Sequence, residues 1–190
     1  RLTTTWEDER GKMRNMARRS ALQLMLKKAP AEVETLSRTA LNEALLSQAV
    51  TVADPMEGGF GDQNRFPMAP QLMALLDLQA EAPHPQLAEF LTLTLDKMAG
   101  EGLRDHLAGG FFRYTVDPSW QVPHFEKMLY TQAQLSAVYL RAAQVFGRDD
   151  YAALARDTLS VVIREMAATQ GGGSVSSFSA VEGAGAVGAV

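Results

Sequence analysis

The feature that most constrains this chain is a pair of adjacent glycines that recurs between helical segments. Gly-Gly occurs at residues 58–59, 109–110 and 171–173, each time after two segments with helical periodicity. Consecutive glycines break helices, because they lose the most backbone entropy on ordering and readily adopt positive φ. A period of roughly 50–60 residues is typical of αα-hairpins that stack on their neighbours. The sequence therefore predicts an all-α fold with about three helical hairpins.

Apolar residues recur at helical spacing through most of the chain. The expected helices cover residues 1–28, 32–52, 70–80, 86–100, 124–146 and 150–169. In the segment 86–100, for example, Leu87, Leu91 and Leu95 share one face and Glu89 and Asp96 lie opposite. Residues 171–190 contain mostly Gly, Ser, Ala and Val, and we expect them to be a truncated next segment.

The connections between stacked hairpins also have a predictable place. In a closed ring of hairpins, the connections of one class collect at one end. The segments 60–66, 105–120 and 174–179 should then lie around one mouth. An open helical solenoid has the same sequence pattern and differs only in closure, so both architectures remain open at this point.

The stretch 105–130 is the first candidate for a functional site, because it holds two of the three histidines and one of the two tryptophans. Loops with this composition between regular helices often carry function. Pro123 suits the first turn of a helix, which places His124 at the positive end of the helix dipole and favours a neutral imidazole that can accept a proton. On that helix Glu126 points almost the opposite way, so we do not expect His124 and Glu126 to form an acid–base pair.

Proton transfer by His106 and His124, as in an epimerase or isomerase, is the chemistry that these residues favour. Asp105 is a candidate to orient His106, and Glu126 is a further candidate acid. Aromatic and cationic side chains are candidates for binding a substrate. The candidate binding residues are Arg113, Tyr114, Trp120, Phe60, Arg65 and Tyr130. The alternatives are a histidine bonded to a loop carbonyl, aromatic side chains packed in a core, and an Arg113–Asp117 ion pair.

Composition excludes several classes of site. The chain has 190 residues, 46% of them hydrophobic, a net charge of −4 and no cysteine. The absence of cysteine excludes disulfides, cysteine-ligated zinc and a Cys-x-x-Cys redox centre. The three histidines form no i, i+4 pair, so we expect neither a metal site nor a cofactor.

The same composition bears on partners and location. The basic residues of segment 1–28 alternate with apolar ones, which favours a solvated amphipathic helix over a nucleic-acid site. No apolar run approaches the ~20 residues of a membrane span and no signal peptide is visible, so we expect a cytoplasmic protein without a membrane partner.

Two segments resemble a known family. Residues 109–117, Gly-Gly-Phe-Phe-Arg-Tyr-Thr-Val-Asp, and 120–130, Trp-Gln-Val-Pro-His-Phe-Glu-Lys-Met-Leu-Tyr, are similar to a motif of the thioredoxin-domain-containing proteins that include the spermatogenesis-associated thioredoxin-like proteins. Gly-Gly-Phe-Gly at 58–61 and Arg-Phe-Pro at 65–67 resemble a second segment of that family. The resemblance implies a helical domain similar to the six-hairpin (α/α) toroids of glycosidases and N-acylglucosamine 2-epimerases. About half of such a toroid fits in this chain.

The chain departs from the family pattern at several positions. Ala108 stands where the family usually has a third glycine, Phe112 where it often has histidine, and Thr131-Gln132 where it often has Asp-Asn. Ser179 and Val181 fall where many members carry aspartates. The loss of these carboxylates counts against glycoside hydrolysis, which uses two.

The resemblance therefore implies a carbohydrate-binding or carbohydrate-active toroid, with a sugar as ligand and epimerase-like or isomerase-like chemistry rather than hydrolysis. The alternative is a non-catalytic interaction or scaffold module that works with a thioredoxin-like domain. By resemblance, residues 1–30 are a basic linker helix at the end of such a domain, residues 31–170 are the hairpin domain and residues 171–190 its truncated tail. Half a toroid exposes helix faces, so we also expect a homo-oligomer.

Overall fold

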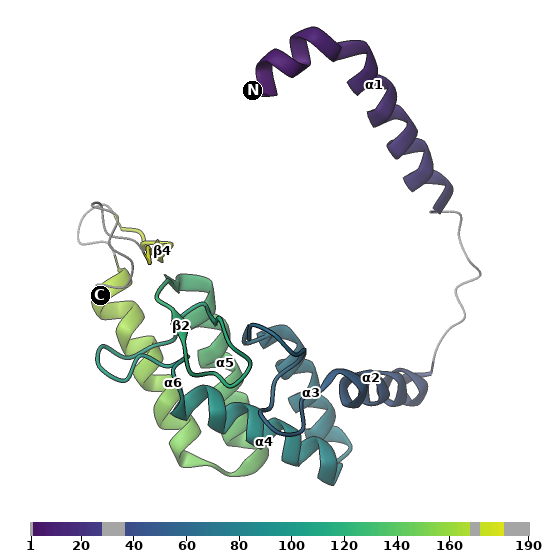
Figure 1. Cartoon of the computed structure of the whole chain (residues 1–190). Coiled ribbons are helices and arrows are strands. Elements are labelled where there is room, and N and C mark those ends of the chain that lie inside the picture. Colours follow the sequence, from purple (N-terminus) through teal and green to yellow (C-terminus); the bar gives the residue numbers. More distant parts are fainter. Residues whose placement is uncertain (1, 28–36, 168–171, 181–190) are drawn as a thin grey trace. The chain divides into compact units, whose positions relative to one another are not determined.

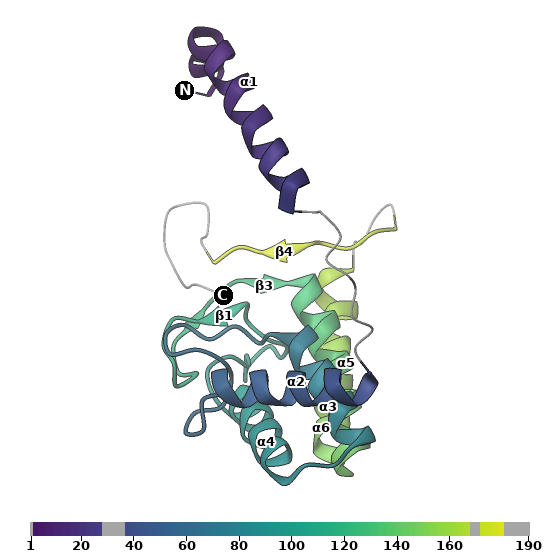
Figure 2. The ribbon, with the colours of Figure 1, turned by 90° about the vertical axis from the view of Figure 1, so that its right-hand side faces the viewer.

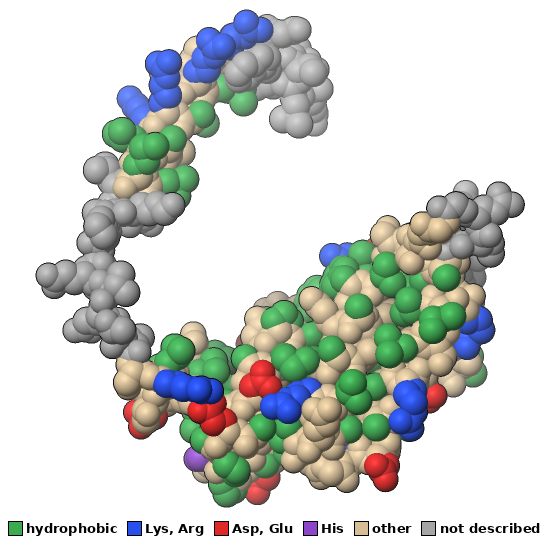
Figure 3. Space-filling view, turned by 180° about the vertical axis from the view of Figure 1, so that it is seen from behind, with side chains coloured by type: hydrophobic (Ala, Val, Ile, Leu, Met, Phe, Trp, Pro, Cys, Tyr) green, Lys and Arg blue, Asp and Glu red, His purple; other side chains and the backbone are tan. Residues whose placement is uncertain are grey.

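The computed structural model describes residues 2–27, 37–167 and 172–180 (Figure 1). The chain divides into two compact units, residues 1–39 and 40–190, which are described separately. The first unit is dominated by helix α1 (Leu2–Lys27), which kinks at Glu9, where φ is −122° and ψ is 26°. Figure 3 shows that basic and hydrophobic side chains both reach the surface of α1. The helix break expected at Pro30 lies outside the described residues.

The second unit is built from antiparallel helical hairpins. Its helices are α2 (Arg38–Val52, which begins at the unit boundary), α3 (Ala69–Glu81), α4 (Pro85–Gly100), α5 (Leu129–Phe146) and α6 (Asp149–Val161), followed by the π-helical turn η1 (Val162–Met166). Short turns join α3 to α4 and α5 to α6, and the two hairpins pack together through α3 and α5 (Figure 1). In the described parts of the chain, no helix is both long and apolar enough to cross a membrane.

Proline and glycine set the helix ends where the sequence places them. Proline occupies the first turn of α3 and of α4, where its missing N–H costs no hydrogen bond. Helix α5 ends at Gly147, whose φ of 65° lets its N–H bond the Ala143 carbonyl. Helix α6 begins with Asp149 and Asp150, whose charges favour the positive end of the helix.

The core lies between the hairpins and includes the apolar stripes that the periodicity predicts. The fully buried members include Leu72, Leu75, Leu76, Leu87, Leu91, Leu95, Met98, Leu135 and Tyr139. The Tyr139 hydroxyl donates to the Leu95 carbonyl at 2.8 Å, and the Tyr139 ring stacks on Phe111 at 5.5 Å. Each such large side chain contributes roughly 1.5–3 kcal/mol when fully buried.

The long connections lie together at one end of the hairpins, as the sequence predicts. Short strand β1 (Tyr114–Thr115) pairs antiparallel with β2 (Pro123–His124), and β3 (Lys127–Met128) pairs with β4 (Ser177–Phe178), as Figure 2 shows for β3 and β4. An isolated bridge between Arg65 and Thr115 joins the first long connection to the second.

One predicted helix start is wrong. Residues 123–128 are not the first turns of α5, which begins at Leu129; they form β2, a tight turn at Phe125 and β3 instead. Local signals such as Pro123 favoured a helix, but β1 pairs with residues 123–124 and the Arg113 N–H donates to the Glu126 carbonyl at 2.8 Å. Pairing with a distant segment has overridden local propensity.

The last helix also differs from its expected form. The sequence predicts one helix over 150–169, whereas α6 gives way to η1 at Val162. Ala167 then bridges to Ser174, so the helix ends where this third connection begins. Residues 168–169 lie outside the described part of the chain.

Candidate functional site

A stack of three aromatic rings marks the candidate site. The rings of Phe66 and Tyr114 lie 4.6 Å apart at 14°, and those of Tyr114 and His124 lie 4.8 Å apart at 14°. Tyr114 and His124 are direct cross-strand partners of β1 and β2, so their side chains project on the same face. The bridge between Arg65 and Thr115 brings the neighbouring Phe66 onto the other side of Tyr114.

A carboxylate lies next to the His124 end of this stack. Residues 123–128 are not helical: the Glu126 N–H donates to the His124 carbonyl at 2.7 Å, which makes a tight turn at Phe125 between β2 and β3. The His124 Nδ1 is 4.0 Å from Glu126 Oε2, and the same oxygen accepts a hydrogen bond of 2.8 Å from Arg113 Nη1. The expectation that His124 and Glu126 face apart is therefore wrong, and it fails because the helix begins later.

The charge of Arg113 depends on its neighbours in this cluster. The Glu126 carboxylate, followed by Tyr130, raises the pKa of Arg113 above its usual value, so the guanidinium stays cationic. The Nδ1 of His124 and the Nε of Arg113 are buried and have no hydrogen-bond partner within the described segments. The His124 side chain is 37% exposed although its Nδ1 is buried, so another part of the ring reaches the surface.

A hollow lies beside the stack. It has a volume of ≈ 170 Å³ and separates the start of α3 from the start of α5. We call it the site hollow. Its lining includes Phe66, Gln71, Arg113, Tyr130 and Gln134. Two of the six residues predicted to bind substrate, Arg113 and Tyr130, thus line one hollow. Another of them, Tyr114, stacks on the lining residue Phe66.

Two predicted catalytic residues lie elsewhere. His106 is exposed, and its Nε2 contacts the Glu101 carbonyl at 3.1 Å rather than His124. Asp105 is buried and accepts a hydrogen bond of 2.6 Å from Lys127 Nζ, so it does not orient His106. Burial alone would raise the pKa of Asp105, but the bonds from Lys127 and from the amides of residues 107 and 108 outweigh it and hold that pKa below its usual value.

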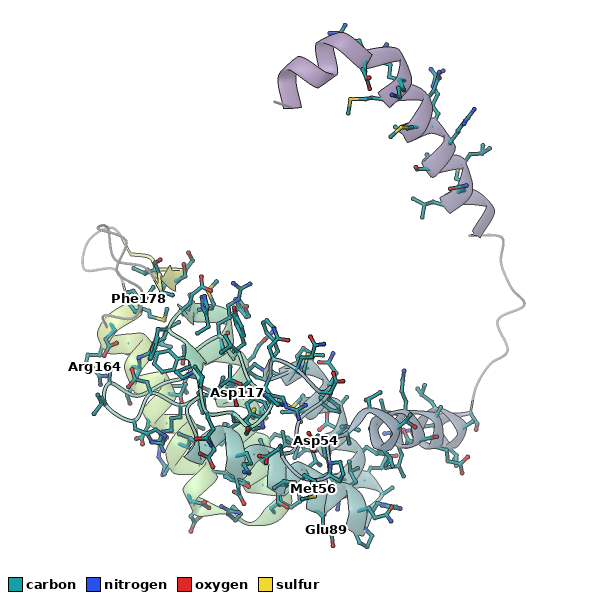
Figure 4. The ribbon with its side chains drawn as sticks, in the orientation of Figure 1. Asp54, Met56, Glu89, Asp117, Arg164 and Phe178 are labelled. Carbon is teal, nitrogen blue, oxygen red and sulfur yellow. The ribbon has the colours of Figure 1, made fainter. Side chains whose placement is uncertain are left out.

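Trp120 and Arg65 belong to the scaffold rather than to a binding surface. Both side chains are 0% exposed. The Trp120 indole N–H donates to the Glu57 carbonyl at 2.9 Å. The Arg65 guanidinium donates to the Asp54 carboxylate, to the Gly61 carbonyl and, at 2.8 Å, to the Pro118 carbonyl. Asp54 and Asp117, labelled in Figure 4, mark the two long connections that these side chains join.

Phe60 also packs away from the three-ring stack. Its ring lies 5.2 Å from that of Phe90, and it lines a second hollow. Sequence reasoning missed one residue of the cluster, Phe66, which lies within the recognised segment at 65–67 without a visible reason to single it out. It also missed Lys127, which binds Asp105 away from the cluster.

Comparison with known proteins gives relatives over most of the chain. No family model matches it. Spermatogenesis-associated protein 20 of Mus musculus and that of Homo sapiens are each 36% identical over 140 residues, which is 72% of this chain and 18% of the relative. An uncharacterized protein of Caenorhabditis elegans is 40% identical over 101 residues, 51% of this chain and 14% of that protein. The chain thus spans less than a fifth of the length of these curated relatives.

Solved structures agree on the fold. The cellobiose 2-epimerase of Spirochaeta thermophila matches with a TM-score of 0.64 at 19% identity, over 77% of this chain and 41% of that one. A D-mannose isomerase matches with a TM-score of 0.57 at 15% identity, over 74% and 40% of the two chains. Identities this low establish the fold alone. The chain is therefore similar in sequence to spermatogenesis-associated protein 20, and its helical hairpins form part of a six-hairpin (α/α) toroid of the cellobiose 2-epimerase kind.

Proposed function

We propose that this chain binds a sugar in the site hollow against Arg113, and that the carbonyl end of the sugar extends past Arg113 to His124, which moves a proton on it in an aldose–ketose isomerisation. His124 lies outside the lining of the hollow, and the observation that carries the proposal is its position: its ring stacks on Tyr114, its Nδ1 lies beside the Glu126 carboxylate that Arg113 binds, and its side chain is 37% exposed. The shared fold with sugar epimerases and an isomerase supports a sugar as the ligand. Aromatic faces and a few polar groups in a hollow are typical of such sites.

The proposed reaction needs one base. In the open-chain aldose, the neutral Nε2 of His124 takes the proton from C2, and the C2–H electron pair forms the C1–C2 double bond of an enediolate. The carbonyl π electrons go to the C1 oxygen, whose charge the Arg113 guanidinium can stabilise. A proton then moves from the C2 hydroxyl to the C1 oxygen, and the imidazolium returns its proton to C1, which leaves a ketose.

Glu126 has a positioning role in this scheme. Its carboxylate, held by Arg113 at 2.8 Å, lies 4.0 Å from His124 Nδ1 and can attract the imidazolium that forms during the reaction. Epimerisation at C2 would need proton delivery from the opposite face of the enediolate, which calls for a second base. His106 does not contact His124, so the described residues favour isomerisation over epimerisation.

The test is proton exchange with solvent. The chain is incubated with D-mannose or D-glucose in D₂O, and ketose formation and deuterium at C1 and C2 are followed by NMR. His124→Ala should lower the rate at least ~100-fold, the usual contribution of a general base. His106→Ala is the matched control and should keep the parent rate. Absence of both sugar binding and exchange with the parent chain would refute the proposal.

A non-catalytic interaction module is the second candidate, and α1 favours it. Met16, Leu22, Leu24 and Met25 on this helix are 59%, 61%, 68% and 74% exposed, which leaves apolar surface for a partner. The partner we infer is a thioredoxin-like domain, in keeping with the family resemblance. Leu24→Asp should then weaken binding of such a domain supplied in trans and leave sugar binding unchanged. A cytoplasmic location remains a prediction from the sequence.

A further inference from the structure

A second hollow adjoins the site hollow across the start of α3. It has a volume of ≈ 520 Å³ and lies between α2 and α3. Three residues, Met68, Pro70 and Gln71, line both hollows. All three are exposed, so a ligand can pass over this turn from one hollow to the other without displacing buried side chains.

The chemistry of the second hollow differs from that of the first. Its lining is Leu45, Gln48, Ala49, Val52, Phe60, Met68, Pro70, Gln71, Ala74 and Leu75. Two amides are its polar side chains, and none of the lining residues is charged. A sugar ring carries hydroxyls around its whole edge, and each one that loses water without a new hydrogen bond costs free energy. An apolar group suits this lining better than a second sugar does. We call it the apolar hollow.

The two hollows also differ in size. The site hollow has a volume of ≈ 170 Å³ and the apolar hollow ≈ 520 Å³, against ~300–1,000 Å³ for small-molecule pockets, so the site hollow alone holds only part of a ligand of that size. The shared residues and the two different linings describe a ligand with a polar part and an apolar part. In the site hollow, Arg113 and Tyr130 face the polar part.

We propose that the substrate is a reducing sugar that carries an apolar substituent on a hydroxyl away from C1. This inference rests on the proposed function and narrows its substrate class. The sugar occupies the site hollow, and the substituent lies over Met68 in the apolar hollow. The substituent cannot be at C1, because a glycoside does not open to the carbonyl form that the isomerisation needs.

The experiment compares 6-O-octyl-D-glucose with 6-O-methyl-D-glucose, both below the concentration at which the octyl sugar aggregates. Dissociation constants are measured by calorimetry for the parent chain and two variants. Ala74→Phe fills the apolar hollow from an exposed position on α3, and Ala80→Phe makes the same change at an exposed position of that helix outside the hollow. Circular dichroism checks that both variants fold.

The octyl sugar should bind the parent chain at least ~10-fold more tightly than the methyl sugar, because its alkyl chain leaves water. Ala74→Phe should abolish this difference and keep the methyl sugar's affinity, whereas Ala80→Phe should keep the difference. Equal affinities in the parent chain would overturn this inference and leave the proposed function standing. If neither sugar binds, the proposed function fails as well.

Two further outcomes would overturn the inference. Tight octyl-sugar binding that survives Arg113→Ala would show an apolar contact without a sugar site and would count against the proposed function as well. Light scattering that shows a parent dimer and an Ala74→Phe monomer would assign the apolar hollow to a second copy of the chain.

Discussion

Two loops of this chain, residues 53–60 and 104–111, make the same turn twice. Each is closed by a bridge between its ends, Ala53 with Phe60 and Arg104 with Phe111. In the first, the Asp54 N–H donates to the Gly59 carbonyl and the Gly58 N–H to the Asp54 carbonyl, both at 3.0 Å. The same two bonds, at the same length, recur in the second loop between Asp105 and the glycines at 109 and 110.

The loops differ in the segment that lies between each aspartate and its cation. Asp54 is paired with Arg65, eleven residues later, and the chain then enters α3. Asp105 is paired with Lys127, twenty-two residues later, and the interval holds β1, β2 and most of the candidate site. The repeated turn is therefore scaffold, and the longer interval between Asp105 and Lys127 holds most of the residues to which we assign the proposed reaction. A third bridge, between Ala167 and Ser174, repeats the spacing without the aspartate or the phenylalanine.

The largest effect should come from breaking the buried ion pair of the second loop. The Lys127 and Asp105 side chains are 4% and 9% exposed, so Asp105→Ala leaves a buried, uncompensated cation and should cost about 3–5 kcal/mol of unfolding free energy. Urea denaturation measures it. Asp105→Ala with Lys127→Met should recover most of the loss. Asp54→Ala tests the first loop, and a cost below about 1 kcal/mol at only one of the two positions would show that the two turns are not equivalent.

The glycines should show the next largest effect. A Cβ added to Gly59, where φ is +74°, would lie 2.6 Å from Trp120 Cζ2. Gly59→Ala therefore adds overpacking, about 1–3 kcal/mol, to the cost of a left-handed backbone, about 1–2 kcal/mol. Gly61, at φ +83° with nothing within 4 Å, is the control and should show the backbone cost alone. Equal losses at Gly59 and Gly61 would mean that Trp120 moves aside freely.

Lowering the pH should reduce the stability that both aspartates contribute. For Asp54, burial would raise the pKa, but bonds from the amides of residues 56 and 57 and from Arg65 lower it overall, as the corresponding bonds do for Asp105. A carboxyl whose pKa is lower in the folded state adds stability above its usual value, 3.8, and loses it as the pH falls through the folded pKa. Urea midpoints measured downward from about pH 5 should fall, and less steeply in Asp105→Asn. An unchanged slope in that variant would contradict the assignment.

The smallest change in stability should come from a substitution between Asp105 and Lys127. Arg113 and Glu126 are 41% and 21% exposed, so Glu126→Gln should cost no more than about 1 kcal/mol. Its effect on sugar turnover should nevertheless be large, because His124 loses the nearby carboxylate that attracts the imidazolium of the proposed reaction. Parallel urea and deuterium-exchange measurements separate the two effects. If Glu126→Gln turns over the sugar at the rate of the parent chain, Glu126 has no role in the proposed reaction.

The helices were predictable because their information is local. The segments 70–80 and 86–100 lie within α3 and α4, since the apolar spacing and the prolines act within a few residues. The start of α5 could not be predicted in this way, because the pairing of β1 with β2 decides the backbone conformation at His124. Arg65 and Trp120 have the composition of a binding site, and only their distant partners, Asp54 and Glu57, identify them as buried scaffold.

The bond between Trp120 and Glu57 joins residues 63 positions apart, and it sets an order of assembly. On a ribosome the first turn emerges well before the tryptophan that closes over it. The residues of the candidate site come after Glu57 in the chain, so the segment against which Trp120 packs is already synthesised when they emerge. A pause in synthesis between Glu57 and Trp120 would leave the surface that Trp120 covers exposed, where chaperones could bind it or aggregation could begin.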